Sequence, residues 1–289
     1  MKRIVLHGRD IDVSSHEHVR HLISLLDKYE FAVFLTRSLE GSNRELDFGL
    51  ATVLDEFNPQ DYDAIFSLGG DGTFLETLTI VGDTKVPILG INTGRLGFLA
   101  TIAKDQIHNA IAKIVEGKYK IEERTLLALD TDASIFGGKR YALNEFTILR
   151  KETSSMIVIK AFLDGNYLST YWADGLMVAT PTGSTGYSLS CGGPILLPHT
   201  SNFIITPVSP HNLNIRPLIV PDTSEITFEV ESRNLDFLVS LDSRSETVHG
   251  GLDLKVRKSD FKAKLIKIEG DLFVDTLRNK LNWGLDKRN

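Results

Sequence analysis

The chain has 289 residues, of which 42% are hydrophobic and 24% charged, a mix typical of folded globular proteins and unlike that of disordered or fibrous ones. Its 32 Lys and Arg residues against 38 Asp and Glu residues give a net charge of -6, which argues against a broad nucleic-acid-binding surface. The length predicts two domains, at roughly 100 to 200 residues each, with one large domain as the alternative. The single cysteine, Cys191, and the lack of a secretory or membrane-spanning apolar run favour a cytoplasmic protein without a membrane partner.

The first hundred residues alternate short apolar runs with amphipathic stretches. The amphipathic segment His16 to Lys28 predicts a helix, because its apolar residues recur at helical spacing. The predicted strands are Ile4 to His7, Phe31 to Leu35, Ala64 to Leu68 and Val86 to Ile91. Strands separated by helices predict an α/β domain with a doubly wound parallel sheet.

From about residue 119 the pattern changes to β-branched and aromatic segments separated by turn residues. Met156 to Leu163, for example, is followed by Asp164-Gly165-Asn166, which is typical of a hairpin. A β-rich second domain is therefore expected, with a boundary near residue 100. The stretch Asp271 to Leu281 again predicts a helix, which we expect to pack back on the first domain. The predicted domains are residues 1–100 with 271–289, and residues 101–270.

A glycine-rich loop follows the predicted strand Ala64 to Leu68 and opens a helix. The loop consists of Gly69, Gly70, Asp71, Gly72 and Thr73. Glycines let the backbone approach a phosphate chain, and a helix start presents unpaired N–H groups to an anion. The carboxylate of Asp71 would repel phosphate unless it holds a cation or accepts a proton from the attacking group. The spacing fits neither a Walker loop nor a dinucleotide fingerprint, so another kind of phosphotransferase loop is predicted.

A second glycine-rich segment, Asn92 to Leu99, follows the next predicted strand. Neighbouring parallel strands end at one edge of a sheet, where ligands of open α/β folds bind, so both loops are expected there. Arg95 is predicted to neutralise phosphate charge, with a solvated arginine on a domain linker as the alternative.

Two polar segments of the β-rich half indicate nucleotide binding. Ala173 to Pro194 is rich in hydroxyl-bearing residues and glycines that suit ribose and amide groups, and Tyr187 offers a ring face for a base. Asn144 and Glu145 interrupt an apolar strand, where burial without partners would be costly. Adenine or ribose hydroxyls are candidate partners, and an exposed strand end explains the pair equally well.

Taken together, these motifs resemble those of the NAD kinase family. The resemblance rests on Gly69 to Thr73, Asn92 to Leu99, Asn144-Glu145, Asp174-Gly175 and Thr180 to Gly193, in order along almost the whole chain. It implies ATP-dependent transfer of a phosphoryl group to the 2'-hydroxyl of the adenosine ribose of NAD, giving NADP, with a divalent metal ion such as Mg²⁺. It also implies an α/β domain joined to a β-sandwich domain, assembled as a homodimer or homotetramer.

The resemblance also implies roles for individual residues. Asp71 would be the catalytic carboxylate, which orients the hydroxyl and accepts its proton late, because an aspartate is too weak a base to remove it in advance. The phosphate and ATP loop would comprise Gly69, Gly70, Gly72, Thr73 and Arg95. The NAD-binding residues would be Gly72, Asn144, Glu145, Asp174, Thr185, Gly186, Tyr187, Ser188, Leu189, Ser190, Asp242 and Arg244.

Two positions depart from the common family pattern. Trp172 stands where many members carry Arg, which removes one phosphate partner, and Asp242-Ser243-Arg244 replaces Asp-Gly-Gln, which could restore one. Two other functions stay open as alternatives. One is a lipid kinase of the diacylglycerol or sphingosine type, which shares the glycine loop but needs an apolar trough for its substrate. The other is a non-catalytic NAD(P)-binding regulator, which would gain nothing from the Asp71 carboxylate beside the phosphates.

Overall fold

The computed structural model describes residues 1–94, 96–151, 156–231 and 236–282. The chain forms two compact units, unit 1 with residues 1–123 and 263–289, and unit 2 with residues 124–262. Helix α4 (Ile107–Val115) belongs to unit 1, so this division lies beyond the sequence-based boundary near residue 100. In the part of the chain that the structure describes, no helix has the length and apolar character needed to cross a membrane.

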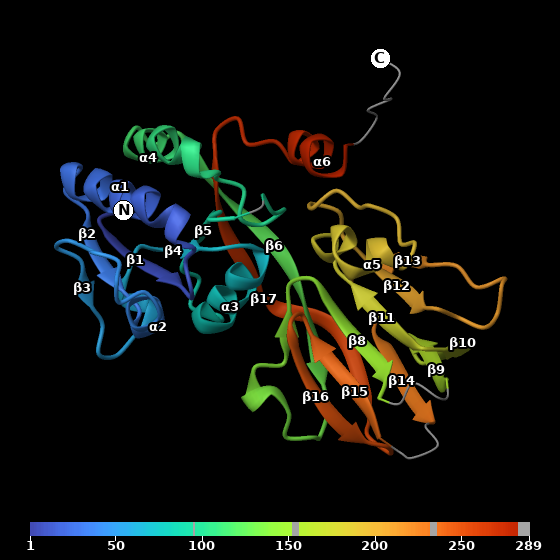
Figure 1. The fold of residues 1–289 in the computed structure, drawn as a ribbon. Helices are drawn as coiled ribbons and strands as arrows, with labels where there is room; N and C mark the ends of the chain where they lie inside the picture. Colours follow the sequence, from blue (N-terminus) through green and yellow to red (C-terminus); the bar gives the residue numbers. More distant parts are fainter. Residues whose placement is uncertain (95, 152–155, 232–235, 283–289) are drawn as a thin grey trace. The chain divides into compact units, whose positions relative to one another are not determined.

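Unit 1 is built on a parallel sheet with the strand order β17-β5-β4-β1-β2-β3 (Figure 1). Its strands are β1 (Arg3–Gly8), β2 (Ala32–Leu35), β3 (Thr52–Val53), β4 (Ala64–Leu68), β5 (Ile88–Ile91) and the end of β17 (Leu254–Ile268). Its helices are α1 (His16–Lys28), α2 (Arg37–Ser42), α3 (Asp71–Val81), α4 and α6 (Phe273–Leu281), with 3₁₀ turns η1 (Val13–Ser15), η2 (Pro59–Asp61) and η3 (Lys104–Gln106). The predicted parallel sheet, its first helix and the returning C-terminal helix are confirmed.

The helices of unit 1 cover both faces of the sheet. Figure 1 shows α1 and α4 on one face and α3 on the other. α1 buries one stripe of apolar residues, which includes Leu22 and Leu26, against a core shared with α4 and the sheet. Strand β4 is buried along its whole length, as expected of a central strand of a parallel sheet. Because β4 and β5 are parallel neighbours, the loops after them start at the same edge.

Unit 2 contains two antiparallel sheets. One has the order β10-β9-β14-β17 with β6 and β7 alongside, and the other has the order β13-β12-β11-β8-β15-β16. The first sheet uses β6 (Tyr119–Asp130), β7 (Tyr141–Ala142), β9 (Ile157–Leu163), β10 (Asn166–Ala173), β14 (Ile226–Glu231) and the start of β17. The second uses β8 (Glu145–Arg150), β11 (Gly175–Ala179), β12 (Asn202–Val208), β13 (Leu218–Pro221), β15 (Asp236–Leu241) and β16 (Arg244–His249), and the connections carry α5 (Tyr187–Ser190), η4 (Phe136–Gly138) and η5 (Gly183–Thr185).

The two sheets of unit 2 enclose one apolar core, as in a β-sandwich. Phe146 on β8 and Phe228 on β14 stack across the core with ring centroids 5.8 Å apart. The predicted hairpin between β9 and β10 is confirmed, since Asp164 and Gly165 both have positive φ, as a two-residue type I′ turn requires.

Truncation of a core residue of α1 tests the fold of unit 1. Leu22 is fully buried, so Leu22→Ala should lower the free energy of unfolding by about 2 to 5 kcal/mol. Leu50 is 85% exposed, so Leu50→Ala should change it by less than about 0.5 kcal/mol. Urea denaturation of both variants and the wild type measures the difference. Equal stability of the two variants would contradict the assignment of the core face.

Candidate active site

The first glycine-rich loop connects β4 to α3, and the N–H groups at the start of this helix have no acceptor within the helix. Gly70 occupies the N-cap position, and the N–H of Phe74 donates to the Gly70 carbonyl at 3.1 Å. The N–H groups of Asp71, Gly72 and Thr73 therefore precede the first intrahelical bond. Together with the helix dipole, they form the kind of site at which proteins bind phosphate.

The carboxylate of Asp71 joins this loop to the second glycine-rich loop. Its Oδ2 accepts a hydrogen bond from the backbone N–H of Phe98 at 2.9 Å, and its Oδ1 accepts from the N–H groups of Leu99 and Ala100, each at 3.0 Å. Gly97 permits this approach, because a Cβ at that position would lie 1.8 Å from Oδ1. We call this arrangement the Asp71 clasp. It holds the two loops together within unit 1.

The clasp leaves part of the Asp71 carboxylate available. An ionised carboxylate has about four lone-pair positions, of which the three backbone donors use two on Oδ1 and one on Oδ2. Oδ2 can therefore accept one more hydrogen bond. Lys280 of α6 lies on this side, with its Nζ 3.7 Å from Oδ2. Arg95, predicted to neutralise phosphate charge in the second loop, lies outside the described residues.

A second carboxylate organises the predicted dinucleotide residues of unit 2. Asp242, in the turn between β15 and β16, accepts hydrogen bonds from the backbone N–H groups of Leu143 at 2.9 Å, Asn144 at 2.7 Å and Glu145 at 3.2 Å. Its own N–H donates to the Glu145 carbonyl at 3.0 Å. Burial raises the pKa of Asp242, and the three N–H donors oppose that rise. Asp242 thus fixes the backbone of the Asn144-Glu145 pair.

Glu145, by contrast, is a buried carboxyl group with an unpaired oxygen. Among the described residues, none donates a hydrogen bond to its Oε2. Burial, and then the charge of Asp242, raise the pKa of Glu145 to about 8. Because Asp242 has donors and Glu145 Oε2 has none, the proton of this pair resides on Glu145 at neutral pH. Two glycines bring the hydroxyl-rich segment against the pair: a Cβ on Gly183 would lie 2.1 Å from the Asn144 carbonyl oxygen, and one on Gly186 would lie 3.4 Å from Glu145 Oε2.

Tyr187 and Asp174 lie close to Glu145. Burial raises the pKa of the Tyr187 phenol, and so do the nearby Cys191 thiol and the carboxylates of Asp174 and Glu145. The Asp174 carboxylate is paired with the Arg150 guanidinium, with Nε to Oδ1 at 3.1 Å and Nη2 to Oδ2 at 3.2 Å. Unit 2 therefore gathers three of the predicted side chains, two acids and a partly exposed phenol, in one cluster.

Two other predicted residues of this segment, Ser188 and Thr185, have their side chains engaged within the protein. Ser188 is fully buried and its hydroxyl shares a 2.9 Å hydrogen bond with that of Thr206. The Thr185 hydroxyl donates to a backbone carbonyl at 3.3 Å. Leu189 is half-buried and Ser190 is exposed. Their contacts with a dinucleotide stay a prediction.

The two departures from the family pattern also have structural contexts. The Arg244 guanidinium donates to the backbone carbonyls of Lys139 and Tyr141, next to the turn that carries Asp242. Trp172 is 51% exposed on β10. Arg244 and Asp242 support the chain around Asn144-Glu145 in this structure, and their role as direct ligands of NAD stays a prediction.

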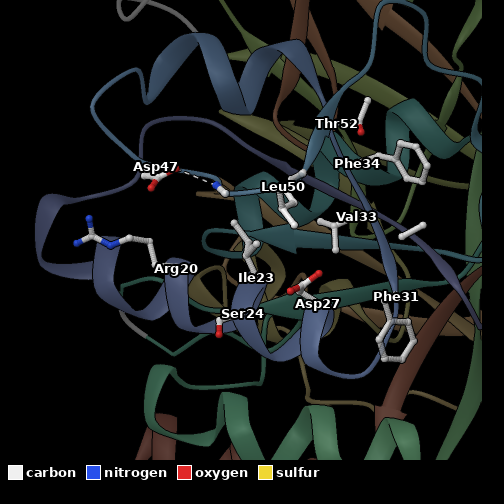
Figure 2. Close-up of a pocket in the computed structure, with 13 residues that line it drawn as sticks. Arg20, Ile23, Ser24, Asp27, Phe31, Val33, Phe34, Asp47, Leu50 and Thr52 are labelled. Carbon is white, nitrogen blue, oxygen red and sulfur yellow. Dashed lines mark hydrogen bonds between the residues drawn. The ribbon is translucent and has the colours of Figure 1, made fainter.

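A groove of about 490 Å³ lies elsewhere in unit 1, between α1 and the segment that leads into β3. Figure 2 shows Ile23, Val33 and Leu50 on its walls, with the carboxylate of Asp27 directed toward it. None of the predicted site residues lines this groove. The candidate functional residues are therefore those of the clasped loop in unit 1 and those of the polar cluster in unit 2.

Comparison with known families matches both parts of the chain. Residues 11–119 match the ATP-NAD kinase N-terminal domain, and residues 143–268 match the ATP-NAD kinase C-terminal domain. The chain is similar to an NAD kinase of Cytophaga hutchinsonii, with 48% identity over 98% of this chain and 99% of that protein. It is also similar to an NAD kinase of Bacteroides fragilis, with 43% identity over 99% of both.

Two solved structures have a similar fold. One is yeast NADH kinase complexed with NADH, with a TM-score of 0.85 and 25% identity over 99% of this chain and 89% of that chain. The other is an NAD kinase from Archaeoglobus fulgidus in complex with ATP, with a TM-score of 0.75 and 26% identity over 97% of both chains.

The proton on Glu145 makes the stability of the fold depend on pH. In the unfolded chain this carboxyl group loses its proton near pH 4.5, and in the folded protein near pH 8. Between these values the folded state binds more protons, so the free energy of unfolding should fall as the pH rises, by on the order of 3 kcal/mol. Glu145→Gln cannot ionise and should show a flatter profile in urea denaturation between about pH 5 and about pH 8.

The matched control is Glu56→Gln, which changes an exposed glutamate and should keep the wild-type pH dependence. A Glu145→Gln profile as steep as that of the wild type would show that Glu145 is already ionised in the folded protein at neutral pH.

Proposed function

Because the chain belongs to the NAD kinase family, we propose that Asp71 is the carboxylate that serves its reaction, the ATP-dependent phosphorylation of NAD to NADP. The bond between the ribose 2'-oxygen and the γ-phosphorus forms as the bond from that phosphorus to the bridging oxygen of ADP breaks. The hydroxyl proton passes to Asp71. The observation that carries this proposal is the clasp, which fixes the Asp71 carboxylate by three backbone N–H groups and leaves one position on Oδ2 for the hydroxyl.

Asp71 contributes to the rate mainly by positioning the attacking hydroxyl. A carboxylate is too weak a base to remove a sugar proton in advance, and phosphoryl transfer has a loose transition state in which little proton transfer is needed early. An Oδ2 held rigidly by the second loop can orient the attacking hydroxyl and accept its proton as the new O–P bond forms. The rate enhancement then depends on the geometry of the clasp.

The start of α3 would bind the phosphate groups of ATP. The N–H groups of Asp71, Gly72 and Thr73 have no acceptor within the helix and suit a phosphate chain. The glycines Gly69 and Gly70 let that chain approach the backbone closely. These donors are fixed before the reaction and need no rearrangement as negative charge moves. Arg95 stays a predicted further partner of the phosphates.

Asn144, Glu145, Asp174 and Tyr187 would bind NAD. A protonated Glu145 both donates and accepts hydrogen bonds, so it can pair with a ribose hydroxyl or a ring nitrogen, and its unpaired Oε2 offers one such position. The Asp174 carboxylate adds hydrogen-bond acceptors. The partly exposed ring of Tyr187 adds a face on which a base can stack. We assign the segment Thr185 to Ser190 to the same ligand.

A divalent metal ion, most simply Mg²⁺, would enter with ATP and neutralise phosphate charge. Within the described residues, no three His, Cys, Asp or Glu side chains are grouped to hold a metal by themselves. That arrangement fits Mg²⁺, which is commonly held by substrate phosphates with one or two carboxylates. The family resemblance further supports a homodimer or homotetramer, and together with the single cysteine it supports a cytoplasmic location.

The two alternatives are not favoured. A lipid kinase and a non-catalytic regulator share individual motifs, but both halves of the chain match the ATP-NAD kinase family. Incubation with ATP and Mg²⁺ in the presence of NAD, diacylglycerol or sphingosine distinguishes the three, because a regulator binds NADP without turnover.

Replacement of the carboxylate tests Asp71 directly. Asp71→Asn keeps the size of the side chain and should still fold, yet it should lose NADP formation by about 100-fold or more. Its amide nitrogen can neither accept the hydroxyl proton nor accept the backbone N–H that Oδ2 accepts in the clasp. A coupled assay of NADP formed from NAD measures the loss. Substantial residual turnover would remove Asp71 from its catalytic role.

The clasp can be disturbed without touching Asp71. Gly97→Ala places a Cβ against the Asp71 carboxylate and should lower kcat by at least about tenfold. Gly94→Ala in the same loop should keep most of the activity, because its Cβ would meet no atom within 4 Å. Equal activities of the two variants would show that the close approach of this loop to Asp71 is not required.

A further inference from the structure

The first glycine-rich loop, between β4 and α3, contains no cationic side chain. Its five residues from Gly69 to Thr73 include a carboxylate and no lysine, whereas the transferred phosphoryl group and ADP are strongly anionic. Phosphoryl transfer depends on positive groups placed where negative charge accumulates. Besides the metal ion and Arg95, a basic residue from another element would add positive charge close to Asp71.

Helix α6 supplies a cation next to Asp71. The Nζ of Lys280 lies 3.7 Å from Asp71 Oδ2 and 4.6 Å from the centre of the Phe98 ring. Within the described part of the chain, this is the one ion pair that Asp71 makes. The contact is on Oδ2, the oxygen with a position left for the substrate hydroxyl. The side chains of Lys280 and Asp71 are 33% and 30% exposed, so a ligand can reach both.

The position of Lys280 is fixed by the way α6 is attached. Phe273, two turns earlier on the same face of the helix, also contacts Phe98, with ring centroids 6.1 Å apart. At the start of the helix, Asp271 Oδ2 accepts hydrogen bonds from Thr101 Oγ1 at 2.6 Å and from the buried Lys267 Nζ at 3.1 Å. Thr101 directly follows the residues that donate to Asp71. α6 is thus tied to the second loop at both ends.

We infer that Lys280 is a further catalytic residue, which neutralises the transferred phosphoryl group beside Asp71. In the free enzyme Lys280 pairs with Oδ2, and when the substrates bind its ammonium group turns to the phosphoryl oxygens as the hydroxyl takes its place on Oδ2. A lysine acts as a point charge on a flexible stem, which suits this change of partner. The inference rests on the proposed role of Asp71 in phosphorylating NAD.

A structural role for Lys280 would have different consequences. A basic residue in the last turn of a helix is favourable for the helix dipole, and its removal would lower the stability and leave kcat unchanged. Arg278 provides the matched control, because it lies in the same last turn, carries the same charge and pairs with Asp275 away from Asp71.

Steady-state kinetics of the full-length protein with ATP, Mg²⁺ and NAD test this role. We expect Lys280→Met and Lys280→Gln to lower kcat by about 100-fold, with the KM for NAD changed less than about threefold, because the lost interaction is strongest in the transition state. Lys280→Arg should recover at least about tenfold over Lys280→Met, because it restores the charge. Arg278→Met should keep more than half of the wild-type kcat, and all melting temperatures should agree within about 3 °C.

Two results would overturn the inference. One is a Lys280→Met enzyme that turns over within about twofold of the wild type, and the other is a Lys280→Arg enzyme no faster than Lys280→Met. The activities of the wild type and of Arg278→Met distinguish a failure of this inference from a failure of the proposed function. If neither forms NADP, the proposed function itself fails, and if both do, only the role of Lys280 is at stake.

Discussion

The structure of the candidate site depends on the backbone hydrogen bonds to the Asp71 carboxylate. A charged group that is partly removed from water needs donors, and here three consecutive N–H groups of the second glycine-rich loop provide them. The same bonds bring the second loop against the start of α3, and the absence of a Cβ at Gly97 makes the approach possible. One side chain thus organises two loops and keeps one acceptor position on Oδ2 available.

Unit 2 also contains a carboxylate that accepts three backbone N–H groups, and there the arrangement has a different effect. Asp242 also accepts three consecutive backbone N–H groups, and it thereby fixes the strand start that carries Asn144 and Glu145. The donors favour the charge on Asp242, and that charge together with burial keeps the proton on Glu145. The pair therefore combines a charged carboxylate that has a structural role with a neutral carboxyl group able to donate a hydrogen bond to a ligand.

Much of the fold was predictable because its signals are local. The apolar runs of β1 and β4 and the helical spacing of α1 appear directly in the sequence, and the glycine loop follows its strand as expected. Helix α4 was missed although its buried residues recur at helical spacing, because residues 101–270 were assigned as a whole to the β-rich domain. The Asp71 clasp was not predictable, since its donors are backbone groups that carry no residue signature. The contact between Lys280 and Asp71 was not predictable either, because the two residues lie far apart in the sequence and only the folded helix α6 brings them together.

Amide hydrogen exchange tests the central claim, that the Asp71 carboxylate holds the second loop in place. In the wild type, the amides of Phe98, Leu99 and Ala100 should be protected, and in Asp71→Ala all three should exchange at least about tenfold faster because they lose their common acceptor. Amides of strand β12, which belongs to unit 2, should exchange equally in both proteins. Unchanged protection of the three loop amides in Asp71→Ala would contradict the account.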